Sequence, residues 1–175
     1  MARMDAGQRK NQILDCARKL FSERGYYQTQ ISDIQAEAGV ARGTIYQYFQ
    51  NKEDLFQTLL EKLYSDWKNM LSIQPENMRE EFSTGFKVFK YKIKQSLDFF
   101  IENPDYCNIF LRVGLGLGGN FDRILDRFQG QILVLVTDYL VKGIKMGRIR
   151  PDIDIDLTGN MIGGALLRMC FFYVV

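Results

Sequence analysis

Apolar residues recur along this chain at the spacing of helices. Between positions 8 and 24 they lie three or four residues apart, and Gly25 follows where a helix is expected to end. Because residues three and four apart share one face of a helix, this spacing predicts an amphipathic helix. The same spacing returns further along, so the sequence predicts an all-α fold. The later segments expected to be helical are 52–71, 75–102, 106–113, 121–146 and 157–175.

The segment 29–52 carries two short helical patterns with a glycine between them. Its inward positions at helical spacing are Ile31, Ile34 and Ala38 in the first pattern and Val40, Ile45 and Phe49 in the second. Gly39 supplies the left-handed backbone conformation that ends a helix in a sharp turn. The second pattern leaves four side chains facing outward, which are Arg42, Thr44, Gln47 and Tyr48. Hydrogen-bond donors and aromatic rings on one exposed face suit the major groove of DNA, so the segment predicts a helix-turn-helix.

This segment resembles the DNA-binding signature of the TetR/AcrR family of bacterial transcriptional regulators. In that family a Thr opens the first of the two helices and Ala-Gly-Val makes the turn. The recognition helix follows, and its residues are, in order, a small residue, Lys or Arg, Gly, Thr, an apolar residue and Tyr. The matching positions here are Thr29 and the residues 38–40, 41–46, 48–49 and 51–53. Three positions depart from the pattern, since Gln30 replaces a hydroxyl residue, Gln35 an alanine and Ala41 a serine that would cap the recognition helix.

The resemblance implies a three-helix DNA-binding domain at residues 1–52 and a helical effector-binding and dimerisation domain at 53–175. It also implies a cytoplasmic, ligand-responsive repressor that binds a palindromic operator as a homodimer. The residues expected to contact double-stranded DNA are Thr29, Arg42, Gly43, Thr44, Tyr46, Gln47, Tyr48 and Lys52. Arg42 and Gln47 are expected at base edges, the two tyrosines at the DNA backbone, and Lys52 at a phosphate.

Aromatic residues at helical spacing mark the inward side of the segment 75–102. Such a face can line a cavity for an apolar small molecule, or it can simply fill the core, and both alternatives stay open. Members of the family commonly bind a hydrophobic effector in this domain. The residues expected to line a cavity for it are Trp67, Phe82, Phe86, Phe89 and Phe110.

Residues 114–119 read GLGLGG, which fits the G-x-G-x-x-G pattern of dinucleotide-binding sites. Such a site requires a preceding β-strand, whereas the residues before this segment have helical spacing and no β-branched run. The pattern therefore predicts a break between helices, and no cofactor is expected.

The last two predicted helices are apolar over most of their circumference. Helices of this kind are buried from more than one side, which favours a partner subunit. The residues expected at a homodimer interface of four packed helices are Phe128, Ile132, Tyr139, Ile162, Leu166, Met169 and Tyr173. The final apolar run stops in the middle of its pattern, so the natural chain is expected to continue beyond Val175.

Composition and charge exclude several other classes of protein. Of 175 residues, 46% are hydrophobic, which is enough for a substantial core. The net charge is only +2, yet residues 1–52 hold 8 Lys or Arg against 5 Asp or Glu, so the basic excess falls on the expected DNA-binding domain. The absence of His and three widely separated Cys argue against a metal site and against acid–base catalysis. No run of apolar residues is long enough for a transmembrane helix, so a soluble protein of a reducing compartment is expected.

Two other functions compete with DNA binding. A helical interaction or scaffold module without DNA binding accounts for the helices and aromatic residues but leaves the outward polar cluster unexplained. An enzyme is not expected, because the acids Asp98, Glu102 and Asp105 fit a solvated helix end better than a catalytic carboxylate pair.

Overall fold

A computed structural model describes residues 5–72, 85–109 and 120–174, and eight helices occur in these ranges. They are α1 (Ala6–Gln28), α2 (Ile31–Ala38), α3 (Arg42–Tyr46), α4 (Lys52–Ser72), α6 (Gly85–Glu102), α7 (Pro104–Asn108), α8 (Asn120–Lys145) and α9 (Ile155–Val174). No strand occurs in these ranges, and the predicted all-α fold is confirmed. The glycine-rich break predicted at 114–119 lies outside the described residues.

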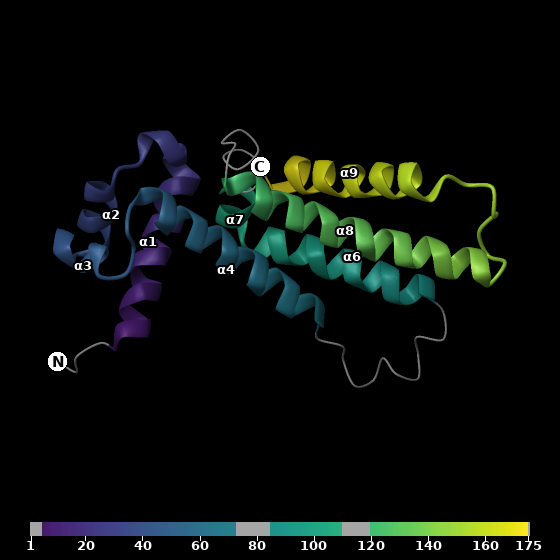
Figure 1. The fold of residues 1–175 in the computed structure, drawn as a ribbon, viewed down its shortest axis with the longest axis horizontal. Coiled ribbons are helices and arrows are strands. Elements are labelled where there is room, and N and C mark those ends of the chain that lie inside the picture. The colour runs from purple at the N-terminus through teal and green to yellow at the C-terminus, as the bar shows by residue number, and fades with distance from the viewer. Residues whose placement is uncertain (1–4, 73–84, 110–119, 175) are drawn as a thin grey trace.

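The first three helices form a small group at one end of an elongated molecule (Figure 1). Asp5 caps α1, because its carboxylate Oδ1 accepts a hydrogen bond from the backbone N–H of Gln8 at 2.8 Å. Gly25 has φ 80° and ψ 170°, so the regular helix breaks where the sequence predicted, and one further turn reaches Gln28. The buried apolar residues of the group are Ile13, Leu14, Ala17, Leu20 and Phe21 of α1, Ile34 and Ala38 of α2, and Ile45 and Phe49 in and after α3.

Helix α4 leads from this group into the body of the molecule (Figure 1). Asn51 caps its start, since the side-chain Oδ1 accepts from the backbone N–H of Asp54 at 2.8 Å. Near this end, Phe56 packs edge-on against Phe21 of α1, with ring centroids 4.8 Å apart. Further along, the Trp67 ring lies 5.2 Å from that of Phe128 in α8. One amphipathic helix therefore continues the hydrophobic core of the first three helices into the body.

In the body, α6, α8 and α9 pack against one another, and α4 packs against α6 and α8 (Figure 1). The close approach of α8 and α9 depends on Gly159. A Cβ atom at this position would lie only 2.9 Å from Leu133 Cδ1 and 3.0 Å from Thr137 Cγ2. A larger residue would push the Leu133 and Thr137 side chains aside, so glycine allows this spacing of the two helices without such a shift.

Candidate nucleic-acid interface and body cleft

The turn between α2 and α3 is built on Gly39. This residue has φ 62° and ψ 35°, the left-handed conformation that glycine adopts without steric cost. The N–H of Gly39 donates to the Ala36 carbonyl at 3.2 Å, and the N–H of Val40 donates to the Gln35 carbonyl at 3.2 Å. These bonds satisfy carbonyls at the end of α2 and turn the chain directly into α3.

The starts of α2 and α3 are held differently. The Asp33 carboxylate accepts from the backbone N–H of Gln30 at 2.8 Å, so half of a capping box survives the replacement of the usual hydroxyl residue. Ala41 provides no side-chain cap for α3, as the sequence predicted. The five residues of α3 therefore depend on packing, with Ile45 and the following Phe49 buried beneath them.

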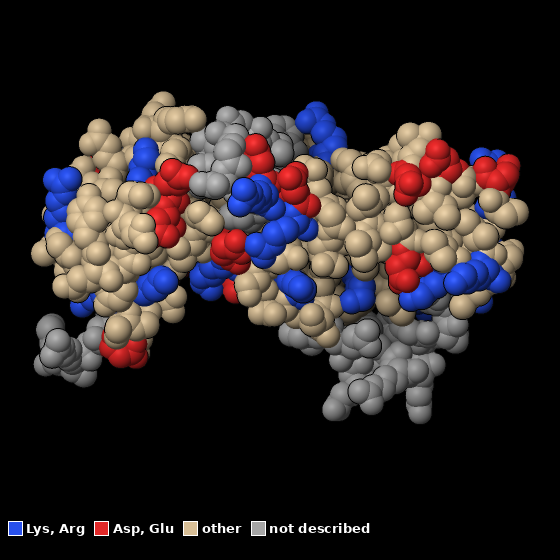
Figure 2. Space-filling model, in the orientation of Figure 1, with Lys and Arg blue, Asp and Glu red and all other residues tan. Residues whose placement is uncertain are grey.

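Six of the eight residues predicted to contact DNA lie on α3 or the turn that follows it. Arg42, Gly43, Tyr46 and Gln47 are exposed, and Thr44 and Tyr48 are half-buried. The Arg42 guanidinium lies 5.9 Å from the centroid of the Tyr46 ring, so donors and an aromatic face stand together. Figure 2 shows Lys and Arg side chains at this end of the molecule, as phosphate contacts require.

The other two residues, Thr29 and Lys52, lie outside α3 and have their polar groups engaged within the domain. Thr29 is fully buried, and its hydroxyl donates toward the carbonyls of Gly25 at 2.8 Å and Leu20 at 3.3 Å. Lys52 is half-buried, and its Nζ donates to the carbonyls of Tyr26 at 3.0 Å and Thr29 at 3.2 Å. The same ammonium lies 4.3 Å from the Tyr26 ring centroid. Lys52 thus ties the start of α4 to the end of α1.

Lys52→Met is expected to lower the free energy of unfolding by about 1–3 kcal/mol, because two carbonyls lose a charged donor. Lys68→Met, at an exposed position of the same helix, serves as the control and is expected to change stability by less than about 0.5 kcal/mol. Urea unfolding of both variants measures the difference. Unchanged stability together with a reduced salt dependence of DNA binding would instead assign Lys52 to a phosphate.

Helix α7 connects the DNA-binding end to the body through α1. The Arg18 guanidinium lies 3.7 Å from the Asp105 carboxylate and 5.1 Å from the Tyr106 ring centroid. Asn108 Nδ2 donates to the Ser22 hydroxyl at 3.4 Å. The sequence predicted that Asp105 lies at a solvated helix end. Nothing in the local pattern indicated that it pairs with Arg18, which is 87 residues away.

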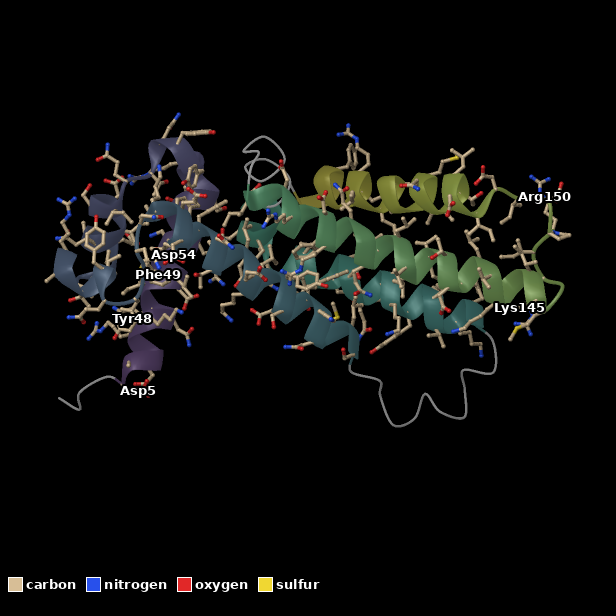
Figure 3. The ribbon with its side chains drawn as sticks, in the orientation of Figure 1. Asp5, Tyr48, Phe49, Asp54, Lys145 and Arg150 are labelled. Atoms are coloured by element: carbon tan, nitrogen blue, oxygen red, sulfur yellow. The ribbon has the colours of Figure 1, made fainter. Side chains whose placement is uncertain are left out.

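A cleft of about 170 Å³ opens in the body between α6, α8 and the segment after α8. Its aromatic wall is a stack of Phe89 on Tyr139, with ring centroids 4.3 Å apart and planes at 12°. The exposed side chains of Phe86 and Met146 lie at its edge. The remaining lining residues are Val88, Lys92, Leu135, Asp138, Lys142, Gly143 and Arg148. Figure 3 labels Lys145 and Arg150 near this region, at the end of the body opposite to α3.

Two of the five residues predicted to line an effector cavity, Phe86 and Phe89, line this cleft. Trp67 does not, because it is almost fully buried against Phe128 and its indole N–H donates to the Ser96 hydroxyl at 3.3 Å. Phe82 and Phe110 lie outside the described residues.

The hydrophobic pattern of the sequence did not indicate the charged side chains around the cleft. Lys142 and Asp138 form an ion pair with 2.7 Å between Nζ and Oδ2, while burial lowers the pKa of Lys92 below its ordinary value. Lys92 follows Phe89 by three residues, so helical spacing places both side chains on one face. The sequence spacing could therefore have indicated that Lys92 lies on the same side of the helix as Phe89. Arg148 follows the end of α8, where no periodicity applies.

The predicted dimer residues divide between the interior and the surface. Phe128 is 1% exposed and packs against Tyr64 and Trp67 within the subunit, whereas Tyr139 is half-buried and stacks on Phe89 in the cleft. Ile132, Ile162 and Leu166 are half-buried, Met169 is exposed, and the Tyr173 side chain is not described. Among the described side chains of α8 and α9, the large apolar ones that face outward are Val134, Leu157, Met161, Met169 and Phe172.

Two further properties of the described residues bear on other classes of site. Across 5–72, 85–109 and 120–174, no three Cys, Asp or Glu side chains gather as metal ligands would. No helix in the same ranges combines the length and the apolar character needed to cross a membrane.

Comparison with known proteins shows that residues 13–59 match the family described as bacterial regulatory proteins, tetR family. The fatty acid metabolism regulator protein of Bacillus subtilis is 31% identical over 159 residues, which cover 89% of this chain and 78% of that protein. The transcriptional repressor KstR2 of Mycobacterium tuberculosis is 29% identical over 88% of this chain and 76% of its own length. A crystal structure of FadR from Bacillus subtilis with stearoyl-CoA superposes with a TM-score of 0.79 at 26% identity, over 94% of this chain and 86% of that one.

Proposed function

Because this chain belongs to the TetR family of bacterial transcriptional regulators and is not an enzyme, we propose that it is a repressor that binds a palindromic operator as a homodimer and is released by a hydrophobic small molecule. The DNA-binding part of this proposal rests on the α2–turn–α3 unit, in which Arg42, Tyr46 and Gln47 are exposed on α3 and the turn after it. A helix presented in this way fits the major groove of a half-site.

Within this interface, Arg42 and Gln47 are assigned to base edges, because both side chains are exposed and carry the donors that base readout needs. Tyr46 and Tyr48 are assigned to the DNA backbone. Lys52 and Thr29 act indirectly, since their polar atoms are engaged inside the domain. The boundary between the DNA-binding domain at 1–52 and the effector domain at 53–175 falls at the first turn of α4.

Arg42→Ala is expected to weaken binding to the cognate operator by about 1–3 kcal/mol at fixed salt and to relax specificity at one base pair. Arg150→Ala is the control, because Arg150 is exposed at the opposite end of the body (Figure 3). Fluorescence anisotropy against the operator and single-base variants measures both effects. A folded Arg42→Ala protein that binds the operator and each single-base variant as tightly as the unaltered protein does would remove Arg42 from base readout.

The cleft between α6 and α8 is the proposed effector site, and the similar FadR of Bacillus subtilis was solved with stearoyl-CoA. We therefore assign the effector to hydrophobic molecules such as acyl compounds. Typical small-molecule pockets have volumes of roughly 300–1,000 Å³, so a cleft of about 170 Å³ must widen around a long chain. Widening that separates α6 from α8 reaches α4, because α4 packs on both helices.

The dimer is assigned to the outer face of α8 and α9. Five large apolar side chains are exposed there in a single copy, and such faces mark interfaces in soluble proteins. A dimer with its two-fold axis at this face holds two copies of α3 related by symmetry, and the two half-sites of a palindromic operator have the same symmetry.

Selection of bound fragments from random DNA tests the proposed function directly. Enrichment of a palindrome whose half-sites are about one helical turn or a multiple of it apart is expected. Acyl compounds that raise the thermal midpoint should release this DNA, and the DNA should weaken their binding by the same factor. Failure to enrich any DNA with a folded protein would favour a helical interaction module instead.

A further inference from the structure

Lys92 both lines the cleft and contacts α4. It sits on α6, three residues after Phe89, and its Nζ donates to the backbone carbonyl of Leu71 at 2.6 Å. Leu71 belongs to the last turn of α4, where carbonyls lack a partner within the helix. The hydrogen bond therefore fastens the distal end of α4 to the wall of the cleft.

The charge of Lys92 is incompletely compensated. Its ammonium donates to the neutral carbonyl of Leu71, and the cleft's carboxylate, Asp138, is paired with Lys142. Partial burial disfavours the ammonium form and lowers the pKa of Lys92 below its ordinary value. With Arg148 included, the lining residues comprise three cations and one carboxylate.

The cleft thus combines an apolar wall with the Lys92 ammonium, which an acceptor stronger than the Leu71 carbonyl would stabilise. Phe86, Phe89 and Tyr139 provide the wall. A hydrogen bond from an ammonium to an anionic oxygen is roughly twice as strong as one between neutral groups. A carboxylate or phosphate beside Lys92 would therefore compete well with the Leu71 carbonyl.

Resting on the proposed function that this cleft is the effector site, we propose that its ligand is an amphipathic anion and that Lys92 exchanges the Leu71 carbonyl for the ligand's anionic head. The apolar body of the ligand lies on the Phe89–Tyr139 stack. The exchange frees the distal end of α4. The proximal end stays tied to the DNA-binding domain through Lys52, so movement of α4 in the body is carried to α3.

Three probes of equal chain length test the ligand class by calorimetry without DNA: decanoate, decanoyl-CoA and the neutral decanol. At least one of the anions is expected to bind about 10- to 100-fold more tightly than decanol. Preference for decanoate alone assigns a carboxylate head, and preference for decanoyl-CoA alone assigns a phosphate head. Equal binding of decanol and both anions overturns the proposal.

Two variants on α6 test the residue. Lys92→Met keeps the apolar stem and is expected to remove the preference for the anion while leaving decanol binding within about threefold. Lys94→Met is the control, because Lys94 is exposed and paired with Asp98 on the same helix. An anion preference retained by Lys92→Met overturns the assignment of the head group to Lys92.

Amide hydrogen exchange at residues 65–72 of the unaltered protein tests the release of α4 and needs no variant. Exchange there is expected to speed up on addition of the anion and to stay unchanged with decanol. Unchanged exchange with a saturating anion overturns the release step. Because none of these measurements uses DNA, they remain decisive even if the protein binds no operator.

Discussion

Glu in place of both Met161 and Phe172 is expected to separate the proposed dimer and to lower operator affinity by roughly 100- to 10,000-fold. The two side chains are 67% and 73% exposed in a single copy and lie eleven residues apart, on one face of α9. Glu at such positions is well solvated in a monomer, whereas burial in an interface without a partner is strongly unfavourable. A monomer holds one half-site and loses the gain from a second linked contact.

Sedimentation equilibrium and a gel shift with the selected operator measure this effect. Ile101→Glu is the matched control, because Ile101 is 56% exposed but lies on α6 rather than on α8 or α9. The control is expected to stay dimeric and to bind the operator normally. A dimer that persists in the Met161 and Phe172 double variant places the interface on another surface.

The helix-turn-helix could be predicted from the sequence because its rules are local. The left-handed Gly39, the inward Ile34 and Ile45 and the uncapped start at Ala41 all follow from spacing and backbone preference within about twenty residues. The role of Lys52 does not follow from such rules, because the carbonyls of Tyr26 and Thr29 meet its ammonium only when α1 and α4 are packed together. The partners of Thr29 are local, since Leu20 and Gly25 lie nine and four residues before it.

In the body, the spacing of apolar residues was not enough to predict which side of each helix is buried, because these helices are apolar on more than one side. It identified Phe128 and Tyr139 as apolar positions of α8, but it gave no means to decide which apolar side meets α4 and α6 and which faces outward. The aromatic wall of the cleft was predicted through Phe86 and Phe89. Its cations come from two separate segments, and their meeting depends on tertiary packing.

Phe128→Ala is expected to lower the free energy of unfolding by about 3–5 kcal/mol, because a buried ring is removed and a cavity remains. Phe128 is 1% exposed, with its ring edge-on to Tyr64 at 5.0 Å and 5.2 Å from the Trp67 ring. Those contacts lie within one subunit, so the loss should be the same at every protein concentration.

Phe172→Ala provides the contrast, since this ring is 73% exposed on the proposed dimer face. It is expected to leave the fold of each subunit intact and to lower the unfolding midpoint mainly in dilute protein, where a weakened dimer dissociates. Thermal unfolding of both variants over a hundredfold range of concentration separates the two roles. A concentration-dependent loss in Phe128→Ala together with a concentration-independent loss in Phe172→Ala would reverse the assignments, because only residues at a subunit interface couple stability to mass action.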